Sequence, residues 1–350
     1  MKTKIILSFF LLLGVTKQLM AQTEKWTSGR ADGHAPMGVM ADHVHHKGEW
    51  MVSYRFMNME MEGNLAGTDA ISNEDIFANY MVAPQHMTMQ MHMFGLMYAP
   101  SDRLTFCAMA NLIDNDMELL TSNSMMMMPM MRNVTFETAS QGLGDVKIGA
   151  LYQLFNKNRR TLHLNLAVSI PTGSLTETGV TPMSSPDETR LGYAMQLGSG
   201  TCDVNLGATY LKQYENMSYG VQTSYVYRTG ENDEGYTLGN KWNATFWTAY
   251  KFYKKFSASL RADYNDIASI EGADATFMNP MMATVFDAAN SGKKQLDVLL
   301  GLNYGIFKGS LKGLRFQVEA GIPVSQNVEG IQMESTFIMT AGVQYAFGGH

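Results

Sequence analysis

Histidine and methionine side chains gather in two neighbouring stretches near the start of the chain. The first stretch, ADGHAPMGVMADHVHHKGEW (31–50), carries imidazoles and thioethers, and the second, MNMEM (57–61), carries thioethers at every other position. Thioethers suit soft Cu(I), and imidazole suits copper, zinc or nickel. The pattern therefore indicates a site for copper or another soft metal. The candidate ligands are His34, His43, His45, His46, Met57, Met59 and Met61.

The same residues also fit a polar N-terminal arm in a chain that is simply rich in methionine. The chain has 30 methionines, and 22 of them precede position 135. The spacing His-x-His-His is not a fixed structural zinc motif, and cysteine is missing from the stretch. Both interpretations stay open, so copper remains a hypothesis and no other cofactor is expected.

Signals for catalysis are weak along the chain. His163 lies between Leu162 and Leu164, and no serine is marked as its partner. The G-x-S-x-G nucleophile pattern is absent. The glycines of Gly142-Leu143-Gly144 lead into a strand pattern and not into a helix, which excludes a phosphate-binding loop. We therefore expect that the protein is not an enzyme.

Charge and targeting signals narrow the class of protein further. The first 21 residues combine Lys2 and Lys4, a short apolar run and Ala21, which is typical of a secretory signal peptide. The net charge is −6, and it becomes −9 without the three lysines of this segment. An acidic chain lacks the basic surface that nucleic-acid binding needs.

Alternation of apolar and polar residues with a period of two recurs along the rest of the chain. In LHLNLAVSI (162–170), leucine, valine and isoleucine point one way, while histidine, asparagine, alanine and serine point the other. Such alternation predicts β-strands, each long enough for a tilted span of a bilayer. Twelve segments qualify: 49–62, 85–99, 103–114, 143–155, 160–171, 200–213, 217–229, 240–252, 256–269, 294–307, 313–324 and 334–347.

The links between these segments alternate between short and long. Short links such as 99–102 and 156–159 are separated by long links such as 115–142, 172–199 and 325–333. This alternation is typical of outer-membrane barrels, with short periplasmic turns and long extracellular loops. The sequence thus predicts an all-β, transmembrane antiparallel β-barrel of about 12 strands.

The domain organisation and the cellular location follow from that barrel. We expect a signal peptide at 1–21, a His/Met-rich periplasmic arm or plug at 22–47, and the barrel at 48–350. The expected location is the outer membrane of a Gram-negative bacterium. The expected partners are outer-membrane lipid, the barrel assembly machinery and a small-molecule solute. A secreted β-sandwich is the alternative, but nothing in that fold would favour an alternation of short and long links.

Polar positions of the strands predict a charged barrel interior. Such charges must pair or be hydrated, because unpaired buried charge is costly. They either fill the interior as ion pairs or line a polar conduit. By the same polarity rule, Met87, Met89, Met91, Met93 and Met97 are expected to face lipid. The candidate lumen residues are Arg55, Arg103, Lys147, Asp203, Arg228, Arg261, Asp263, Asp297, Arg315 and Glu319.

Three runs of sequence resemble one known family. The runs are GLGDVKIGALYQLF (142–155), LHLNLAVSIPTGS (162–174) and MQLGSGTCDVNLGATY (195–210). They look like the outer-membrane transporter family named for the meta-pathway of phenol degradation. The segments 35–64 and 90–105 resemble a methionine-rich branch of that family. The resemblance implies passage of small hydrophobic or aromatic compounds, and its methionine-rich branch implies metal handling. No catalytic or ligand residue carries over.

Three functional hypotheses result, in order of preference. The first is an outer-membrane channel or transporter for small solutes, including hydrophobic or aromatic compounds. The second is a barrel that handles copper or another soft metal. The third is a barrel enzyme that acts on lipids.

Overall fold

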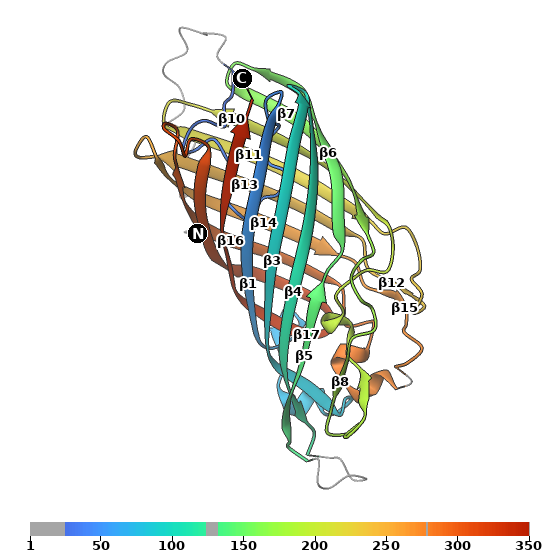
Figure 1. The fold of residues 1–350 in the computed structure, drawn as a ribbon. Helices are drawn as coiled ribbons and strands as arrows, with labels where there is room; N and C mark the ends of the chain where they lie inside the picture. The colour runs from blue at the N-terminus through green and yellow to red at the C-terminus, as the bar shows by residue number, and fades with distance from the viewer. Residues whose placement is uncertain (1–24, 124–131, 278, 350) are drawn as a thin grey trace, which may run out of the picture.

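A computed structural model describes residues 25–123, 132–277 and 279–349, so the predicted signal peptide lies outside the described residues. Within this part of the chain, the fold is a closed antiparallel β-barrel of 11 strands, with two further strands outside the ring. The ring closes where β17 (Leu314–Gly348) pairs with β1 (Glu49–Gly67) (Figure 1). The helices among the described residues are all too short or too polar to cross a membrane.

Each strand of the ring pairs with its neighbour in sequence, which is the simplest way to close an antiparallel sheet. Between β1 and β17 the ring contains β3 (Val82–Ser101), β4 (Leu104–Thr121), β6 (Val146–Lys157), β7 (Arg160–Ile170), β10 (Asp203–Gln213), β11 (Met217–Tyr227), β13 (Lys241–Lys251), β14 (Phe256–Ile267) and β16 (Lys293–Gly305). The two strands outside the ring are β2 (Asp69–Ala70), which pairs with β1, and β5 (Thr135–Leu143), which pairs with β4.

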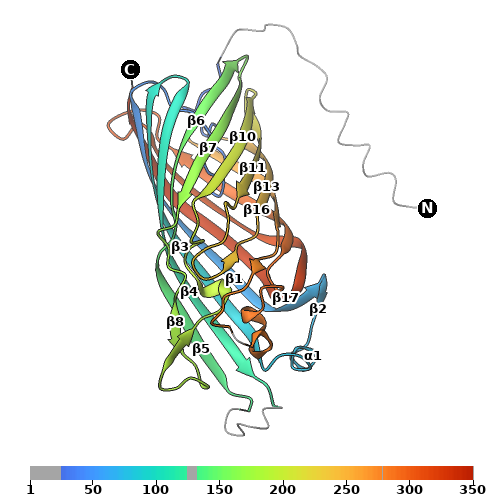
Figure 2. The same cartoon turned by 90° about the vertical axis from the view of Figure 1, so that its right-hand side faces the viewer.

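Short elements gather at one end of the barrel, opposite the end where the chain terminates (Figures 1 and 2). Tight turns such as Asp102–Arg103, between β3 and β4, lie at the end with the C-terminus. The short elements in the long links are α1 (Asn73–Ile76), β8 (Thr178–Val180), β9 (Glu188–Arg190), η2 (Tyr193–Met195), β12 (Tyr236–Thr237), β15 (Glu271–Gly272), η3 (Pro280–Met282) and η4 (Thr284–Phe286). We call the end of the barrel that carries these short elements the loop end.

Most predicted strands agree with the structure to within a few residues, but two predicted links do not. The predicted link 115–142 contains the end of β4 and all of β5 except its last residue, Leu143. The predicted link 325–333 is shorter in the structure, because most of these residues stay in strand conformation within β17. Both segments extend the sheet beyond the apolar stretch that marks a membrane span, so hydrophobic alternation could not reveal them.

Apolar side chains cover the outside of the barrel. On β7, Leu164 and Leu166 are exposed, while His163 before them and Ser169 after them are buried inside. The same alternation holds on β16, where Leu300 is 67% exposed. Exposed side chains of this kind form a belt that hydrocarbon chains can solvate, whereas water cannot do so without cost.

The predicted orientation of the methionines of β3 is wrong along the whole strand. Met87, Met93 and Met97 are buried, so the methionines face the interior, while His86 and Thr88 lie on the outer face. There the His86 ring nitrogen Nε2 lies 3.3 Å from Glu60 Oε2. This part of the strand extends past the apolar belt, and water can solvate a polar outer face there. In the other half of β3, Phe94 and Leu96 take the outer face, so both faces of the strand are apolar and polarity cannot tell them apart.

Candidate functional site

Residues 25–47 form an arm inside the barrel, and inward-facing side chains hold its backbone (Figure 1). Ser257 on β14 donates from Oγ to the carbonyl oxygen of Ala31 at 2.8 Å. Gln222 on β11 donates from Nε2 to the carbonyl oxygen of Met40 at 2.9 Å. Buried backbone groups need such partners. The arm therefore follows a defined path across the lumen.

Apolar packing anchors the arm as well. Trp26, Ala35 and Val39 of the arm form a buried cluster with Leu211 on β10 and Trp247 on β13. Full burial of a large apolar side chain stabilises a contact by roughly 1.5–3 kcal/mol. The arm is thus held by both polar and apolar contacts with the barrel wall.

A buried ion-pair network joins the arm to the wall. Arg261 on β14 donates to Glu319 on β17 through two hydrogen bonds, Nε to Oε1 at 2.8 Å and Nη2 to Oε2 at 3.1 Å. A second carboxylate, Asp263, lies 3.0 Å from Arg261 Nη1. The backbone N–H of Gly38 in the arm donates to Glu319 Oε2 at 2.9 Å. These contacts offset the high cost of burying both charges.

Two more of the predicted lumen cations have partners in the interior. Arg228 forms an ion pair with Asp203. Arg315 donates from Nη2 to the carbonyl oxygens of Ser28 and Arg30, each at 2.9 Å. Arg315 therefore binds the arm's backbone, which sequence alternation alone could not indicate.

Beside the arm lies a cavity of about 770 Å³ with two chemically different walls. We define the methionine wall as the inward methionines of β1, β3 and β4, which are Met51, Met57, Met59, Met89, Met97 and Met109. We define the charged wall as the charged side chains of β13, β14 and β16, which are Lys241, Arg261, Asp263, Lys293 and Asp297. Arg55 and Lys147 also line the cavity, as does Met40 of the arm.

Thioethers continue from the cavity to the loop end. Met61 on β1 is in register with Met87 on β3, which is in register with Met117 on β4. Met87 and Met117 belong to a buried apolar cluster with residues of the long links, such as Leu191 and Met195. Met61 packs against this cluster. The methionine side chain is flexible and unbranched, so this closure can adapt its packing.

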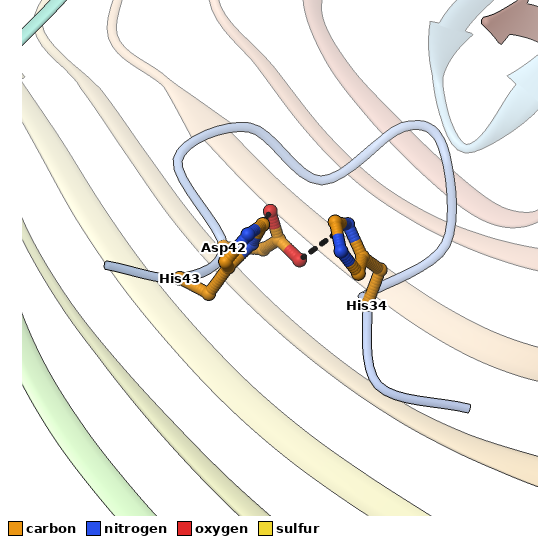
Figure 3. A group of neighbouring side chains, drawn as sticks. All are labelled: His34, Asp42 and His43. Atoms are coloured by element: carbon orange, nitrogen blue, oxygen red, sulfur yellow. Dashed lines mark hydrogen bonds and ion pairs between the residues drawn. The ribbon is translucent and has the colours of Figure 1, made fainter. Parts of the chain in front are cut away.

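Three side chains of the arm come together next to this cavity. His34, Asp42 and His43 each offer a ligand atom, and these atoms lie within 4.8 Å of one another (Figure 3). His43 Nδ1 lies 2.9 Å from Asp42 Oδ1, and the backbone N–H of Ala35 donates to Asp42 Oδ2 at 2.9 Å. The ring of His45 lies 4.6 Å from that of His43, centroid to centroid.

Burial decides the charge state of this cluster. It lowers the pKa of His34 well below its ordinary value, and the positive charge of Arg315 acts in the same direction. Burial also lowers the pKa of His45. Burial alone would raise the pKa of Asp42, but the charge and hydrogen bond of His43 hold it well below the ordinary value. The cluster therefore presents the carboxylate of Asp42 beside the neutral imidazoles of His34 and His45.

The structure separates some of the residues that the sequence grouped together. Arg103 does not line the lumen: it lies exposed in the turn between β3 and β4, because the chain reverses one residue before β4 begins. His46 is also exposed, and its Nδ1 lies 3.7 Å from Asp102. Met61 packs at the loop end, apart from the cavity that Met57 and Met59 line. His34 and His43 are close together, as a ligand set requires.

Lysines 241 and 293 are members of the charged wall that sequence reasoning missed. Lys241 begins β13 and Lys293 begins β16, both at the strand's loop-end terminus. Because alternate residues of a strand share a face, Lys241 lies on the same face as the buried Thr245, and Lys293 on the same face as the buried Asp297. The alternation could therefore have identified both, since Lys241 lies in the predicted strand 240–252 and Lys293 lies one residue before the predicted strand 294–307.

Comparisons with known proteins agree with this architecture. A family model described as "Putative MetA-pathway of phenol degradation" matches residues 78–283, more than half of the chain. Among curated proteins, none matches the sequence. An outer membrane channel from Pseudomonas putida F1 is similar in structure, with a TM-score of 0.59 at 14% identity, covering 88% of this chain and 98% of that chain. This likeness shows a shared fold.

Two further solved structures are similar over most of their length. The toluene transporter TodX from P. putida gives a TM-score of 0.42 at 13% identity, covering 94% of this chain and 96% of that chain. A FadL homologue from Pseudomonas aeruginosa gives 0.38 at 10% identity, with coverages of 85% and 89%. These scores are too low to support an argument about this chain.

Proposed function

Because the chain belongs to the family with that description, we propose that it is an outer-membrane channel for small solutes with an apolar or aromatic face and a polar group. One observation carries the proposal: a closed barrel encloses a cavity of about 770 Å³ between the methionine wall and the charged wall. Sites for small molecules typically measure about 300–1,000 Å³ and combine apolar lining with a few placed polar groups. The cavity fits that description.

The charges around the cavity favour anionic solutes over cationic ones. Five cations line it (Arg55, Lys147, Lys241, Arg261 and Lys293), against three anions (Asp42, Asp263 and Asp297). An aromatic carboxylate would place its ring against the methionine wall and its negative charge toward the lysines. Pore-lining charge selects solutes in this way in other channels.

The placement in the membrane follows from the barrel's outer face. The exposed apolar side chains suit contact with outer-membrane lipid, and insertion by the barrel assembly machinery is part of the proposal. The end with the tight turns and the C-terminus would face the periplasm, and the loop end would face outward. The arm would then plug the periplasmic half of the lumen.

A count of twelve membrane crossings is part of this proposal. Residues 315–328 of β17 pair with β16, whereas residues 328–348 pair with β1. Gly330, between the two halves of β17, has a φ of 66°, a conformation that suits a reversal of the chain. Counted as two crossings, β17 gives an even number of spans, as bacterial barrels have.

Flux through liposomes tests the proposed function. Vesicles containing the mature protein should take up 4-hydroxybenzoate faster than empty vesicles, and faster than they take up a sugar of similar size. Uptake equal to that of empty vesicles for every solute would refute a channel. A sugar that passes as readily as the aromatic anion would refute the proposed preference.

The alternative, handling of copper or another soft metal, draws support from the row of thioethers from Met57 to Met117. Cu(I) titration of the mature protein should separate the two functions. The variant M57L/M59L/M61L keeps the volume nearly constant and removes three sulfurs. Unchanged Cu(I) binding by this variant would exclude these methionines as ligands.

Catalysis at the outer wall finds no support in the position of His163. Its ring is fully buried in the lumen, and Nε2 lies 3.0 Å from the carbonyl oxygen of Ala41. A lipid-cleaving histidine would have to face the hydrocarbon layer. The lipid enzyme therefore stays the last of the three hypotheses.

A further inference from the structure

We propose that His34, Asp42 and His43 bind one divalent transition-metal cation, with Zn(II) or Cu(II) as the preferred ions. The three residues lie at the two ends of one loop of the arm, and Figure 3 shows His34 and Asp42 facing each other across it. His34 Nδ1 lies 3.9 Å from Asp42 Oδ2. This site is independent of which solute passes through the barrel.

Buried nitrogens without partners are the strongest evidence for a ligand. Among the described residues, His34 Nδ1, His43 Nε2 and His45 Nε2 are buried and form no hydrogen bond, while His45 Nδ1 lies 3.3 Å from Glu49 Oε2. His43 and His45 are almost completely buried, at 1% and 2% exposure. An unsatisfied buried polar group costs roughly 1–3 kcal/mol. A cation that accepts their lone pairs best explains why three neighbouring histidines have buried ring nitrogens without a hydrogen bond.

Asp42 is placed to serve as a ligand or to orient His43. Its Oδ1 lies 2.9 Å from His43 Nδ1, so a proton on that nitrogen leaves a lone pair on Nε2 for a metal. Carboxylates commonly fix the tautomer of metal-binding histidines in this way. The second oxygen, Oδ2, accepts the N–H of Ala35 and points toward His34.

The donor set selects the class of metal. Two or three imidazoles with one carboxylate suit Zn(II), Cu(II) or Ni(II), whereas Ca²⁺ and Mg²⁺ prefer oxygen ligands. Cu(I) would call for thioethers, but Met57 and Met59 lie on the barrel wall and outside this group. Of the candidate ligands named from the sequence, His34 and His43 thus belong to the site in the arm, whereas Met57 and Met59 belong to the methionine wall.

The geometry requires only a small closure on binding. Ligand atoms about 2.1 Å from one ion lie at most about 4.2 Å apart. The present upper limit of 4.8 Å therefore calls for side-chain movements of about half an ångström. Because His34 and Asp42 belong to opposite ends of the loop, a bound ion would tie the loop together. Gly38, within this loop, already bonds to Glu319 on the wall.

Nearby positive charge limits the expected affinity. Arg315 is close enough to His34 to influence its charge state, and Arg55 contacts Met40 two residues before Asp42. Only one carboxylate in the ligand set opposes these two guanidinium groups. We therefore expect reversible binding that a strong chelator removes, and not a permanently loaded structural site.

Calorimetric titration with ZnCl₂ tests the proposal on the full mature protein, folded in detergent and free of any polyhistidine tag. The expected result is one Zn(II) per barrel, with affinity at least tenfold weaker in H34N/H43N. The matched control is H46N, because His46 is exposed and lies outside the cluster. This control should bind as tightly as the wild type. The D42N variant retains an acceptor for Ala35 N–H and should weaken binding at least threefold.

A second readout locates the bound ion. The ring of Trp26 lies 5.8 Å from that of His43, so Cu(II) in the site should quench its fluorescence. The quenched fraction of the fluorescence should disappear in W26F. It should also disappear in the double variant H34N/H43N or, if that variant does not fold, in the single variants H34N and H43N. Zn(II) or Cu(II) bound equally by the wild type and all cluster variants would overturn the site. Binding at the cluster and solute flux are measured separately, so failure of one leaves the other standing.

Discussion

The two walls of the cavity line the same space, but one is apolar and the other is charged. On the methionine wall, Met57 and Met59 offer thioethers that need no partner. On the charged wall, Arg261 is fixed by Glu319 and Asp263. The first wall can change shape at little cost, since methionine has several accessible rotamers. The second is rigid at Arg261, because that charge is already paired.

This difference divides the work of recognition between the walls. An adaptable apolar wall accepts rings of different outline, while fixed charges decide which polar groups are tolerated. The contrast also explains the buried charges without assigning them all to transport. Arg261 and Glu319 hold the fold and the arm, whereas Lys241 and Lys293 are the remaining cations of the charged wall and can face a solute.

Breaking the rigid wall should have the largest effect. The substitution E319Q leaves Arg261 with one carboxylate and weakens the hold on Gly38 of the arm. Removing one partner of a buried ion pair typically costs about 3–5 kcal/mol. Urea unfolding in detergent should show a loss of that size. E215Q, in an exposed turn, is the control and should stay within about 0.5 kcal/mol of the wild type. Equal stability of E319Q and E215Q would mean that the network is hydrated.

Changing the chemistry of the adaptable wall should have the next largest effect. M57Q/M59Q places amides where the ring of an aromatic solute would lie, so 4-hydroxybenzoate uptake should slow about tenfold, equivalent to about 1.4 kcal/mol. M57L/M59L keeps the apolar surface and nearly the same volume, and its uptake should stay within about twofold of the wild type. If both variants behave alike, the wall has no role in selection.

Neutralising the two lysines should have the smallest effect. K241M/K293M removes two of the cations at the cavity, so uptake of 4-hydroxybenzoate should fall about threefold. Uptake of an uncharged aromatic solute should not change, because the apolar wall is intact. A parallel fall for both solutes would indicate altered packing and not a loss of charge selection.

The sequence predicted the barrel well because strand alternation is a local property. Residues such as Leu164 and His163 reveal their sides of the sheet from spacing alone. The rule failed on β3, where Met87 faces inward although its neighbours are polar. Alternation reports which face is more apolar, and it cannot tell lipid from a buried closure at the loop end.

The site was predicted only in part because its contacts are distant in the chain. The sequence identified Arg315 as a lumen cation, but not that it binds the carbonyl groups of the arm. His34 and His43 were named among seven candidate ligands, while the loop that joins them to Asp42 became visible only in three dimensions. Which side chains meet across a lumen depends on register around the whole ring.

The two native cysteines allow the most direct test of the central claim, that solutes pass through this cavity. Both are free; Cys107 lines the cavity on β4, and Cys202 is exposed. In the C202S variant, a bulky methanethiosulfonate reagent on Cys107 should block 4-hydroxybenzoate uptake, with labelling verified by mass spectrometry. In C107S, labelling of Cys202 should leave uptake unchanged. Full uptake with Cys107 completely labelled would contradict the account, because the solute would then bypass the cavity.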